Sequence, residues 1–370
     1  MRISIDLRKL HDYGIGTYIR NLVINLARID KNTDYVLLCR PKDNDFVEGL
    51  GDNFRALPQT DPLYSVSEQL RIPAQLRRAK IDVFHAPHYT LPFTTPCNSV
   101  VTIHDCIHLL FPQYLPNRVA HIYARTALWI AANRSSRVLT VSEASKNDIL
   151  RFFKIDPGKI TVIPNGIDGQ FKVEPSAEAI ANVQERYQLK SPFLLYVGNV
   201  KPHKNLERLI DAFFKLRKDG LKTLTLLIIG DEITKYTTLR RTVHRYQLHK
   251  YVRFLGFVPA NTLSILYRLA DAFVFPSLYE GFGLPPLEAM ASGTPVVTSN
   301  VSSLPEVVGN AAMLVDPYDV DSIANGIQTV LEDSAYREKL TENGLKRSQI
   351  YSWERSVVKI KQIYDELGSS

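Results

Sequence analysis

The chain is poor in cysteine and lacks any long apolar run, and both absences exclude classes of protein. Its 370 residues include three cysteines, Cys39, Cys97 and Cys106, which lie in or beside apolar runs without the spacing of a metal site. They indicate reduced, buried thiols of a cytoplasmic protein. No apolar run approaches the ~20 residues that span a bilayer. The expected first strand begins at once, over residues 1–6, so no secretory signal is visible.

A three-glycine dinucleotide fingerprint is also missing, which disfavours a dehydrogenase. The nearest pattern is Tyr13-Gly14-Ile15-Gly16, expected as a loop between a strand over residues 3–7 and a helix over about 17–29. Strand, glycine loop and helix can bind a phosphate at the helix N-terminus. The same pattern is equally typical of an ordinary helix start, and both readings of Gly14 and Gly16 stay open here.

The composition is that of a globular protein, with 45% hydrophobic and 22% charged residues. A chain of this length predicts two domains. The formal net charge of +7 favours anionic partners, such as nucleotide phosphates or acidic lipid surfaces. Nucleic acid is disfavoured, because no nucleic-acid-binding motif accompanies the charge.

Short apolar strands alternate with helical patterns in both halves of the chain. This order predicts parallel, doubly wound sheets, and therefore two Rossmann-like α/β domains. The expected strands cover residues 3–7, 35–39, 54–57, 82–85, 99–103, 138–141 and 160–163, then 193–197, 223–229, 252–255, 272–275, 295–298 and 312–315. The main expected helices of the second half cover residues 206–218, 236–248, 261–270, 284–291 and 353–367.

The most informative stretch runs from Tyr279 to Gly293. A buried strand precedes it, Gly281 and Gly283 provide a turn, and a helix is expected to follow. Such a turn exposes backbone N–H groups beside the positive end of a helix, which is an anion site. Glu280 before the turn and Glu288 in the helix can accept hydrogen bonds from hydroxyl groups on either side of a phosphate. This combination points to a nucleotide sugar.

The string Glu280-Gly-Phe-Gly-Leu-Pro-Pro-Leu-Glu288, with residues 289–297 behind it, resembles the Glu, seven residues, Glu signature of the family 4 retaining glycosyltransferases. The resemblance covers most of the chain. It implies the GT-B arrangement, in which two Rossmann-like domains face each other across a cleft. We expect an acceptor-binding domain over residues 1–168, a nucleotide-sugar-binding domain over 169–351, and a last helix within 352–370 that crosses back to the first domain.

The resemblance also implies roles for individual residues. Glu288 would bind the ribose, Lys204 the diphosphate, and His104 the sugar. Glu280 and the backbone of Phe282, Gly283 and Leu284 would bind sugar and phosphate. The family often has a donor contact at the turn of Ser142, although this serine is also a natural helix N-cap. Gly14 and Gly16 would face the donor phosphate and the acceptor.

One position departs from the family. Asn199 stands where an arginine usually follows the glycine of the phosphate loop, and Lys201 is the candidate for the missing charge. We expect no metal or other cofactor, because both Asp-x-Asp sequences, Asp43-Asn-Asp45 and Asp319-Val-Asp321, have structural explanations in a polar loop and a helix start. The expected chemistry is front-face transfer, in which the leaving phosphate accepts the proton of the acceptor.

The Thr-Ile-His-Asp segment around His104, followed by Phe111-Pro112, and the Lys-Pro-His-Lys-Asn loop resemble mannosyl- and rhamnosyltransferases more than glucosyltransferases. GDP-mannose is the expected donor. UDP- and dTDP-sugars stay open. The acceptor would be a glycan or a lipid-linked glycan of cell-surface polysaccharide or lipopolysaccharide synthesis. A nucleotide-sugar 2-epimerase and a non-catalytic sugar-nucleotide-binding subunit are the alternatives.

Two basic clusters suggest peripheral contact with the inner face of an anionic membrane. The first lies in an expected helix over residues 65–80 and the second lies among aromatic residues further on; their members are Arg71, Arg77, Arg78 and Lys80, then Arg118, Arg125, Arg134 and Arg137. Solvated helix faces of a soluble enzyme explain the same pattern, and this alternative stays open.

Overall fold

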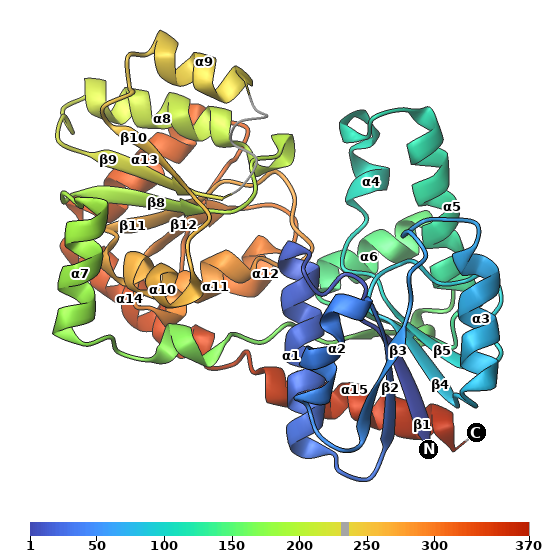
Figure 1. Ribbon diagram of the computed structural model, residues 1–370. Helices are drawn as coiled ribbons and strands as arrows, with labels where there is room; N and C mark the ends of the chain where they lie inside the picture. Colours follow the sequence, from blue (N-terminus) through green and yellow to red (C-terminus); the bar gives the residue numbers. More distant parts are fainter. Residues whose placement is uncertain (231–236, 370) are drawn as a thin grey trace. The chain divides into compact units, whose positions relative to one another are not determined.

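The computed structural model describes residues 1–230 and 237–369, apart from the side chain of Thr237. The chain divides into two compact units (Figure 1). Unit 1 comprises Met1–Gly166 with Ser352–Ser370, and unit 2 comprises Ile167–Tyr351. The division after residue 166 lies two residues before the expected domain boundary. Ser370, the end of the segment expected to contain the last helix, and Tyr236, the start of another expected helix, lie outside the described residues.

Unit 1 is built on a seven-stranded parallel sheet of order β3-β2-β1-β4-β5-β6-β7. Its strands are β1 (Arg2–Asp6), β2 (Asp34–Cys39), β3 (Phe54–Pro58), β4 (Val83–Ala86), β5 (Asn98–Thr102), β6 (Arg137–Thr140) and β7 (Ile160–Val162). Its helices are α1 (Tyr13–Ile29), α2 (Asn44–Glu48), α3 (Glu68–Arg78), α4 (Ile107–Leu110), α5 (Arg118–Arg134), α6 (Glu143–Phe152) and α15 (Trp353–Gly368), with short 3-10 helices η1 (Pro41–Asp43), η2 (Pro112–Tyr114) and η3 (Pro157–Lys159).

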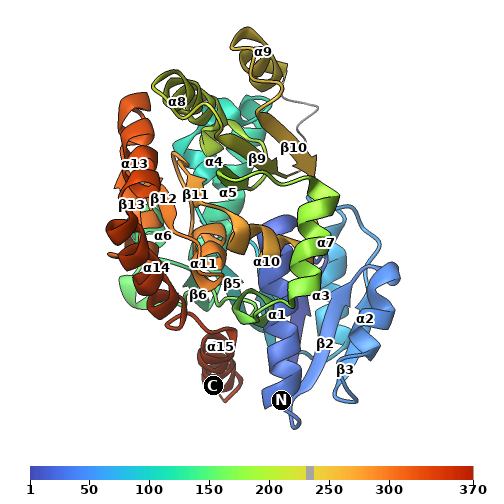
Figure 2. The ribbon, with the colours of Figure 1, turned by 90° about the vertical axis from the view of Figure 1, so that its left-hand side faces the viewer.

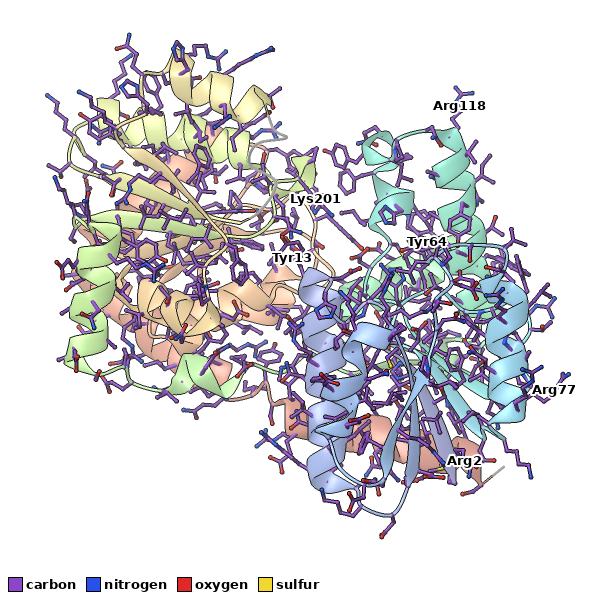
Figure 3. The ribbon with its side chains drawn as sticks, in the orientation of Figure 1. Arg2, Tyr13, Tyr64, Arg77, Arg118 and Lys201 are labelled. Atoms are coloured by element: carbon purple, nitrogen blue, oxygen red, sulfur yellow. The ribbon has the colours of Figure 1, made fainter. Side chains whose placement is uncertain are left out.

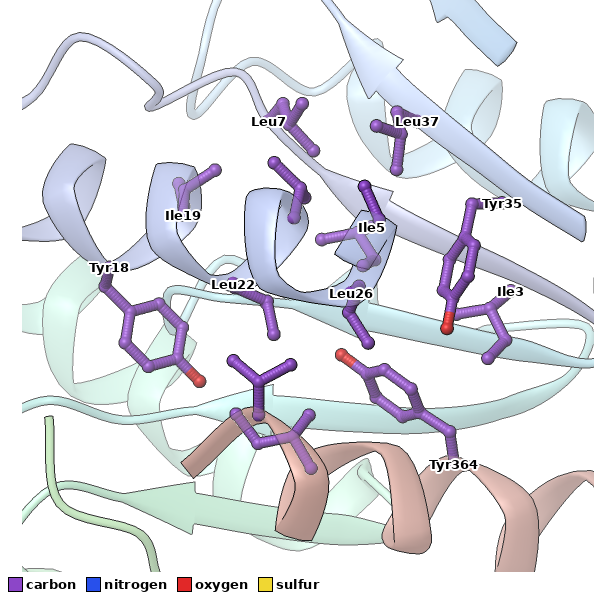
Figure 4. Packing of buried hydrophobic residues seen from close by; sticks show 14 of the residues in the cluster. Ile3, Ile5, Leu7, Tyr18, Ile19, Leu22, Leu26, Tyr35, Leu37 and Tyr364 are labelled. Carbon is purple, nitrogen blue, oxygen red and sulfur yellow. The ribbon is translucent and has the colours of Figure 1, made fainter. Parts of the chain in front are cut away.

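Side chains alternate between the two faces of this sheet, as a pleated strand requires. Tyr35 and Leu37 of β2 pack on the side covered by α1 and α15, whereas Val36 and Leu38 pack on the side of α3, α5 and α6. Figure 4 shows the first of these cores, in which Tyr364 of α15 lies among the side chains of α1 and the strands. The last helix is therefore an integral layer of unit 1.

Unit 2 has a six-stranded parallel sheet of order β10-β9-β8-β11-β12-β13. Its strands are β8 (Phe193–Val197), β9 (Thr225–Ile229), β10 (Val252–Gly256), β11 (Ala272–Phe275), β12 (Val296–Ser299) and β13 (Met313–Val315). Its helices are α7 (Ala177–Tyr187), α8 (Leu206–Lys218), α9 (Thr237–Arg245), α10 (Ala260–Leu269), α11 (Leu284–Ala291), α12 (Leu304–Val308), α13 (Val320–Glu332) and α14 (Ser334–Ser348), with η4 (Gly169–Lys172) and η5 (Pro202–Lys204). Helices α8, α9 and α13 cover one face, and α10, α11 and α14 the other (Figure 2).

The predicted fold class, two Rossmann-like doubly wound domains, is confirmed. In each sheet the strand order reverses once, between β1 and β4 in unit 1 and between β8 and β11 in unit 2. Open α/β sheets bind ligands at the carboxyl ends of the strands that flank such a reversal. The four connections that leave these strands are therefore the first places to look for a site.

Two local expectations were wrong. The predicted loop at residues 13–16 is the first turn of α1, which begins at Tyr13. Asp43, expected in a polar loop, is buried in η1, where its carboxylate lies 2.7 Å from Nε2 of His11. Among the described residues, no helix combines the length and apolarity needed to cross a bilayer. All three cysteines are free, and Cys97 is only half-buried.

Candidate active site

Lys204 and Glu280 meet at the strand reversal of unit 2. Lys204 ends η5, which follows β8, and Glu280 follows β11, the neighbouring strand. The Lys204 Nζ lies 2.6 Å from the Glu280 Oε1, and both side chains are mostly buried. The ammonium also lies 5.3 Å from the ring centroid of Phe275, within cation–π range. Two residues 76 positions apart, predicted from separate patterns, thus form one polar cluster.

Hydrogen bonds hold the loop that carries Glu280. The hydroxyls of Ser302 and Ser303 donate to the Glu280 carbonyl over 2.6 and 2.9 Å, and Ser303 also donates to the Phe282 carbonyl over 2.8 Å. On the other side, Asn205 adopts a left-handed conformation (φ 61°). Its amide donates to the Pro276 carbonyl over 2.9 Å. These contacts fix the backbone on which the ion pair stands.

The start of α11 offers fewer donors than its position suggests. Pro285 and Pro286 occupy the first turn and have no N–H, so the free backbone donors there belong to Phe282, Gly283 and Leu284. Gly283 has φ 112°, and a Cβ at this position would lie 2.8 Å from a methyl group of Leu304. Only glycine fits such a backbone. The anion site is therefore narrow and is built from the turn itself.

Glu288 lies in α11, as predicted, and faces Tyr267 of α10. The Tyr267 hydroxyl donates to Glu288 Oε2 over 3.1 Å. Burial raises the pKa of Glu288 to about 7, the nearby negative charge of Asp168 adds to the rise, and the Tyr267 hydrogen bond opposes it. The carboxyl group therefore changes charge near neutral pH.

Asn199 occupies the position where the family usually has an arginine, and no described side chain beside it clearly supplies the missing positive charge. Asn199 is half-buried after β8, and its carbonyl lies 3.5 Å from the hydroxyl of Tyr196. Lys201 is exposed at the start of η5 and makes no ion pair with another described residue (Figure 3). Lys204 is thus the lysine of this loop that joins the polar cluster.

In unit 1, His104 follows β5 and is fixed by its own neighbours. Its Nε2 lies 2.9 Å from the Pro87 carbonyl, and its ring meets the Tyr18 ring edge-on at 4.9 Å. A carbonyl only accepts, so Nε2 carries the proton and Nδ1 is left as an acceptor. Burial is the largest cause that lowers the His104 pKa. A neutral ring with one free acceptor suits a hydroxyl group.

Ser142 is the N-cap of α6, as predicted: its hydroxyl accepts from the Ser145 amide over 3.0 Å, and the side chain is fully buried. Ser145 in turn donates to the His104 carbonyl over 3.0 Å. Gly16 is buried, and a Cβ there would lie 2.4 Å from the Leu10 carbonyl oxygen, so this glycine serves close packing. Gly14 is exposed in the open first turn of α1.

Three of the four aspartates of the Asp-x-Asp sequences have partners within the protein. Asp319 caps α13 by accepting from the Asp321 amide over 2.9 Å, and Asp321 lies 2.5 Å from Lys215. Asp43 pairs with His11, and Asp45 lies exposed in the first turn of α2. No group of three or more metal-type ligands occurs among residues 1–230 and 237–369.

Sequence reasoning missed the residues that position the site. Tyr267, Asn205, Ser302 and Ser303 touch Glu288, or the loops of Lys204 and Glu280. Asn205 belongs to the Lys-Pro-His-Lys-Asn loop but was given no role, and the other three belong to no chemical motif. Adjacent serines in a loop are one usable signal, since such hydroxyls often bind nearby backbone. The contact of Tyr267 with Glu288 depends on helix packing and has no local signal.

Two family models match the chain. The description "Glycosyltransferase Family 4" covers residues 13–171, and "Glycosyl transferases group 1" covers residues 176–347. Together they include each of the predicted site residues described above, whereas β1 lies before the first matched residue.

Known proteins agree with these models. The O-antigen chain mannosyltransferase B of Escherichia coli is 36% identical over 291 residues, 78% of this chain and 75% of its own. The O-antigen chain mannosyltransferase RfbU of Salmonella typhimurium is 29% identical, over 88% of this chain and 90% of its own. Among solved structures, sucrose-phosphate synthase from Thermosynechococcus elongatus matches with a TM-score of 0.81 at 22% identity, over 100% of this chain and 99% of its own. The chain belongs to the family 4 glycosyltransferases, and it is an enzyme of that family with the GT-B fold.

Proposed function

We propose that this enzyme transfers mannose from GDP-mannose to a glycan or lipid-linked glycan acceptor of cell-surface polysaccharide synthesis, with retention of anomeric configuration. The observation that carries the proposal is the Lys204–Glu280 pair at the strand reversal of unit 2. It places a cation for the diphosphate and a carboxylate for sugar hydroxyls side by side. Mannose as the sugar is supported by the two O-antigen mannosyltransferase relatives.

Each donor part has a matching group in unit 2. The ribose hydroxyls would donate to Glu288, whose carboxylate Tyr267 orients. The diphosphate would bind Lys204 and the turn amides of Phe282 to Leu284, a charge-assisted arrangement that stabilises the departing phosphate. The sugar hydroxyls would reach Glu280. In unit 1, the residue proposed to bind the sugar is His104, through its Nδ1.

In the proposed step, the bond between the sugar C1 and the phosphate oxygen breaks as an acceptor oxygen attacks the same face. The acceptor proton moves to the departing phosphate oxygen, so charge and atoms balance. A double displacement needs a carboxylate nucleophile. Glu280, the nearest candidate, is held by Lys204, which favours binding over attack.

Metal-independent action is part of the proposal. Lys204 and the backbone donors supply positive potential where the diphosphate leaves. Asp319 caps α13, Asp321 pairs with Lys215 and Asp43 contacts His11, so three of the four aspartates of the Asp-x-Asp sequences already have partners within the fold.

A peripheral membrane contact through unit 1 is supported by α5. Val119, Ile122 and Trp129 recur at helical spacing and are 74%, 64% and 47% exposed, with the exposed Arg118 and Arg125 beside them. Exposed apolar side chains flanked by arginine suit an anionic lipid surface. Of the earlier basic cluster, Arg77 and Arg78 are exposed, whereas Arg71 pairs with Asp61 at 3.0 Å. The side chains of Arg77 and Arg118 extend into solvent (Figure 3).

The test is to incubate the purified enzyme with GDP-mannose, UDP-glucose or dTDP-rhamnose, with and without mannosides, and to follow nucleotide release and the product anomer by NMR. We expect release that depends on GDP-mannose and acceptor, and an α-linked product. Conversion of the nucleotide sugar without an acceptor would identify the 2-epimerase alternative. Binding without any turnover would identify a non-catalytic subunit.

A further inference from the structure

A small pocket lies at the strand reversal of unit 1. It is lined by Asp6 at the end of β1, by Lys9 after that strand and by Pro87, His88 and Thr90 after β4, with two aliphatic side chains completing the wall. Its position is that of ligand sites in open α/β sheets. The Pro87 carbonyl is also the group that holds Nε2 of His104 at 2.9 Å. The pocket therefore adjoins the residue proposed to touch the donor sugar.

The pocket presents polar groups that other residues do not use. His88 is only 9% exposed, and its Nδ1 has no hydrogen-bond partner among the described residues. The Thr90 hydroxyl makes no hydrogen bond to another residue of the described chain, and Thr90 is likewise 9% exposed. A buried nitrogen without a hydrogen-bond partner destabilises the folded protein. A ligand that reaches His88 would remove this destabilisation.

The charges around the pocket are already compensated. The Lys9 Nζ lies 2.8 Å from Asp12, and the buried Arg8 lies 2.7 Å from both Asp6 and Glu68. Burial, with the positive potential of Lys9, lowers the pKa of His88, so its ring is neutral. An anionic ligand would meet no unpaired cation among these residues. The pocket suits an uncharged polar group.

The size of the pocket limits that group further. Its volume of about 10 Å³ is close to the space of one water molecule. A sugar ring does not fit, but a single hydroxyl does. A hydroxyl can both donate and accept, so it can pair with His88 Nδ1 in either ring tautomer and with the Thr90 hydroxyl at the same time.

We propose that this pocket receives one uncharged hydroxyl group of the acceptor sugar, held by His88 and Thr90, and thereby selects which acceptor hydroxyl stays free to react. The inference rests on the proposed glycosyl transfer, and it makes the acceptor terminus a neutral sugar. His88 and Thr90 act as specificity residues, because the reacting atoms lie elsewhere on the acceptor.

The test compares methyl α-D-mannopyranoside with its monodeoxy derivatives and its 6-phosphate. Transfer from GDP-mannose gives kcat/KM, and saturation-transfer NMR gives binding without turnover. In the unaltered enzyme, loss of one non-reacting hydroxyl should lower kcat/KM by at least about tenfold, since the site would keep unpaired polar groups. In the His88→Ala enzyme, kcat/KM for methyl α-D-mannopyranoside should fall to the value for that deoxy derivative. KM for GDP-mannose should not change.

His249→Ala, which removes an exposed histidine of unit 2, is the matched control and should retain the selectivity of the unaltered enzyme. Thr90→Ala is a second variant and should lose the same selectivity if His88→Ala does not fold. Selectivity that survives both changes, equal use of all derivatives by the unaltered enzyme, or tighter binding of the 6-phosphate would overturn the inference. Absence of transfer with intact hydroxyl-selective binding would instead refute the proposed function.

Discussion

Lys204 Nζ and Glu280 Oε1 lie 2.6 Å apart, so the cation proposed for the diphosphate is neutralised by the carboxylate proposed for the sugar. An incoming donor must share or replace this contact. The ammonium is therefore partly occupied before any phosphate arrives.

Glu280→Gln should separate the two roles of this pair. Without the competing carboxylate, Lys204 is free for phosphate, and we expect GDP to bind about threefold to tenfold more tightly, which corresponds to about 1 kcal/mol. Transfer should fall at least a hundredfold, because the sugar loses its acceptor group. Calorimetry with GDP and initial rates measure the two effects, and Lys204→Gln is the control that should weaken GDP. A Glu280→Gln enzyme with weaker GDP binding would contradict the competition.

Glu288 should make nucleotide binding depend on pH. Its carboxyl pKa of about 7 means that the charged acceptor form grows between pH 6 and pH 8. We expect GDP affinity to rise about tenfold over this interval, and Glu288→Ala to weaken it by about 1–3 kcal/mol at pH 8. Glu288→Gln should bind GDP with no such pH slope. If the GDP affinity of Glu288→Gln still rose with pH, the pH dependence would belong to another titrating group.

The same raised pKa should affect stability without ligand. The pKa of the Glu288 carboxyl is 4.5 in the unfolded chain and about 7 in the folded protein. Its ionisation therefore lowers the free energy of unfolding as pH rises above 4.5, and this loss is complete above about pH 7. Glu288→Gln should therefore raise the free energy of unfolding by about 1–3 kcal/mol at pH 8 and by little at pH 4.5. Urea titrations at both pH values measure this difference. A gain that is equal at the two values would rule out ionisation as its cause.

His104 should contribute to the use of the donor's sugar and not to the binding of its nucleotide. His104→Ala removes the free Nδ1 acceptor, and we expect kcat/KM for GDP-mannose to fall about tenfold to a hundredfold, the equivalent of one hydrogen bond to the transition state. Affinity for GDP should stay within twofold. Equal losses with GDP and GDP-mannose would show that the substitution disturbs the fold instead.

Transfer should survive EDTA, because Lys204 and the turn amides supply the positive potential at the diphosphate. Rates measured after dialysis against EDTA should match untreated enzyme. Loss of transfer that only magnesium or manganese restores would reverse this prediction and would return attention to Asp43, Asp45, Asp319 and Asp321.

Unit 1 should bind anionic vesicles. Each basic residue near an anionic surface contributes ~1 kcal/mol, and the exposed face of α5 adds apolar contact. Co-sedimentation with phosphatidylglycerol vesicles should exceed that with phosphatidylcholine vesicles, and should weaken with salt, with Arg77→Glu plus Arg78→Glu, and with Ile122→Ser. Equal recovery in the supernatant with both lipids would favour an acceptor in solution.

The sequence predicted the strands of both sheets because apolar runs bounded by Gly and Pro are a local signal. It placed β8, β11, α8 and α11 at their observed bounds. It missed α7, whose scattered apolar positions among polar residues gave a weak periodicity. It also placed the start of α1 four residues late, because Gly14 and Gly16 were taken as loop residues although both lie in the helix.

The candidate site was predictable as separate pieces. Motifs indicated Glu280, Glu288 and Lys204 one by one, but the contact of Lys204 with Glu280 follows from the adjacency of β8 and β11, which no local pattern encodes. The ion-pair partners of charged side chains could not be predicted from the sequence either. Arg71 seemed free for lipid until the fold brought it to Asp61.

Because α15 belongs to unit 1, unit 1 cannot complete its core until the end of the chain has been synthesised. Tyr364 lies in the core beside α1, the Asn98 side chain donates to the Leu367 carbonyl over 2.8 Å, and the Ser356 hydroxyl donates to the Pro164 carbonyl over 2.6 Å. All of unit 2 leaves the ribosome before this helix does. Unit 1 therefore begins first and finishes last, and the part of its apolar core that α15 covers stays exposed while unit 2 folds. A chain that ends at residue 351 would lack α15, so the core of unit 1 would be incomplete, whereas all residues of unit 2 would be present.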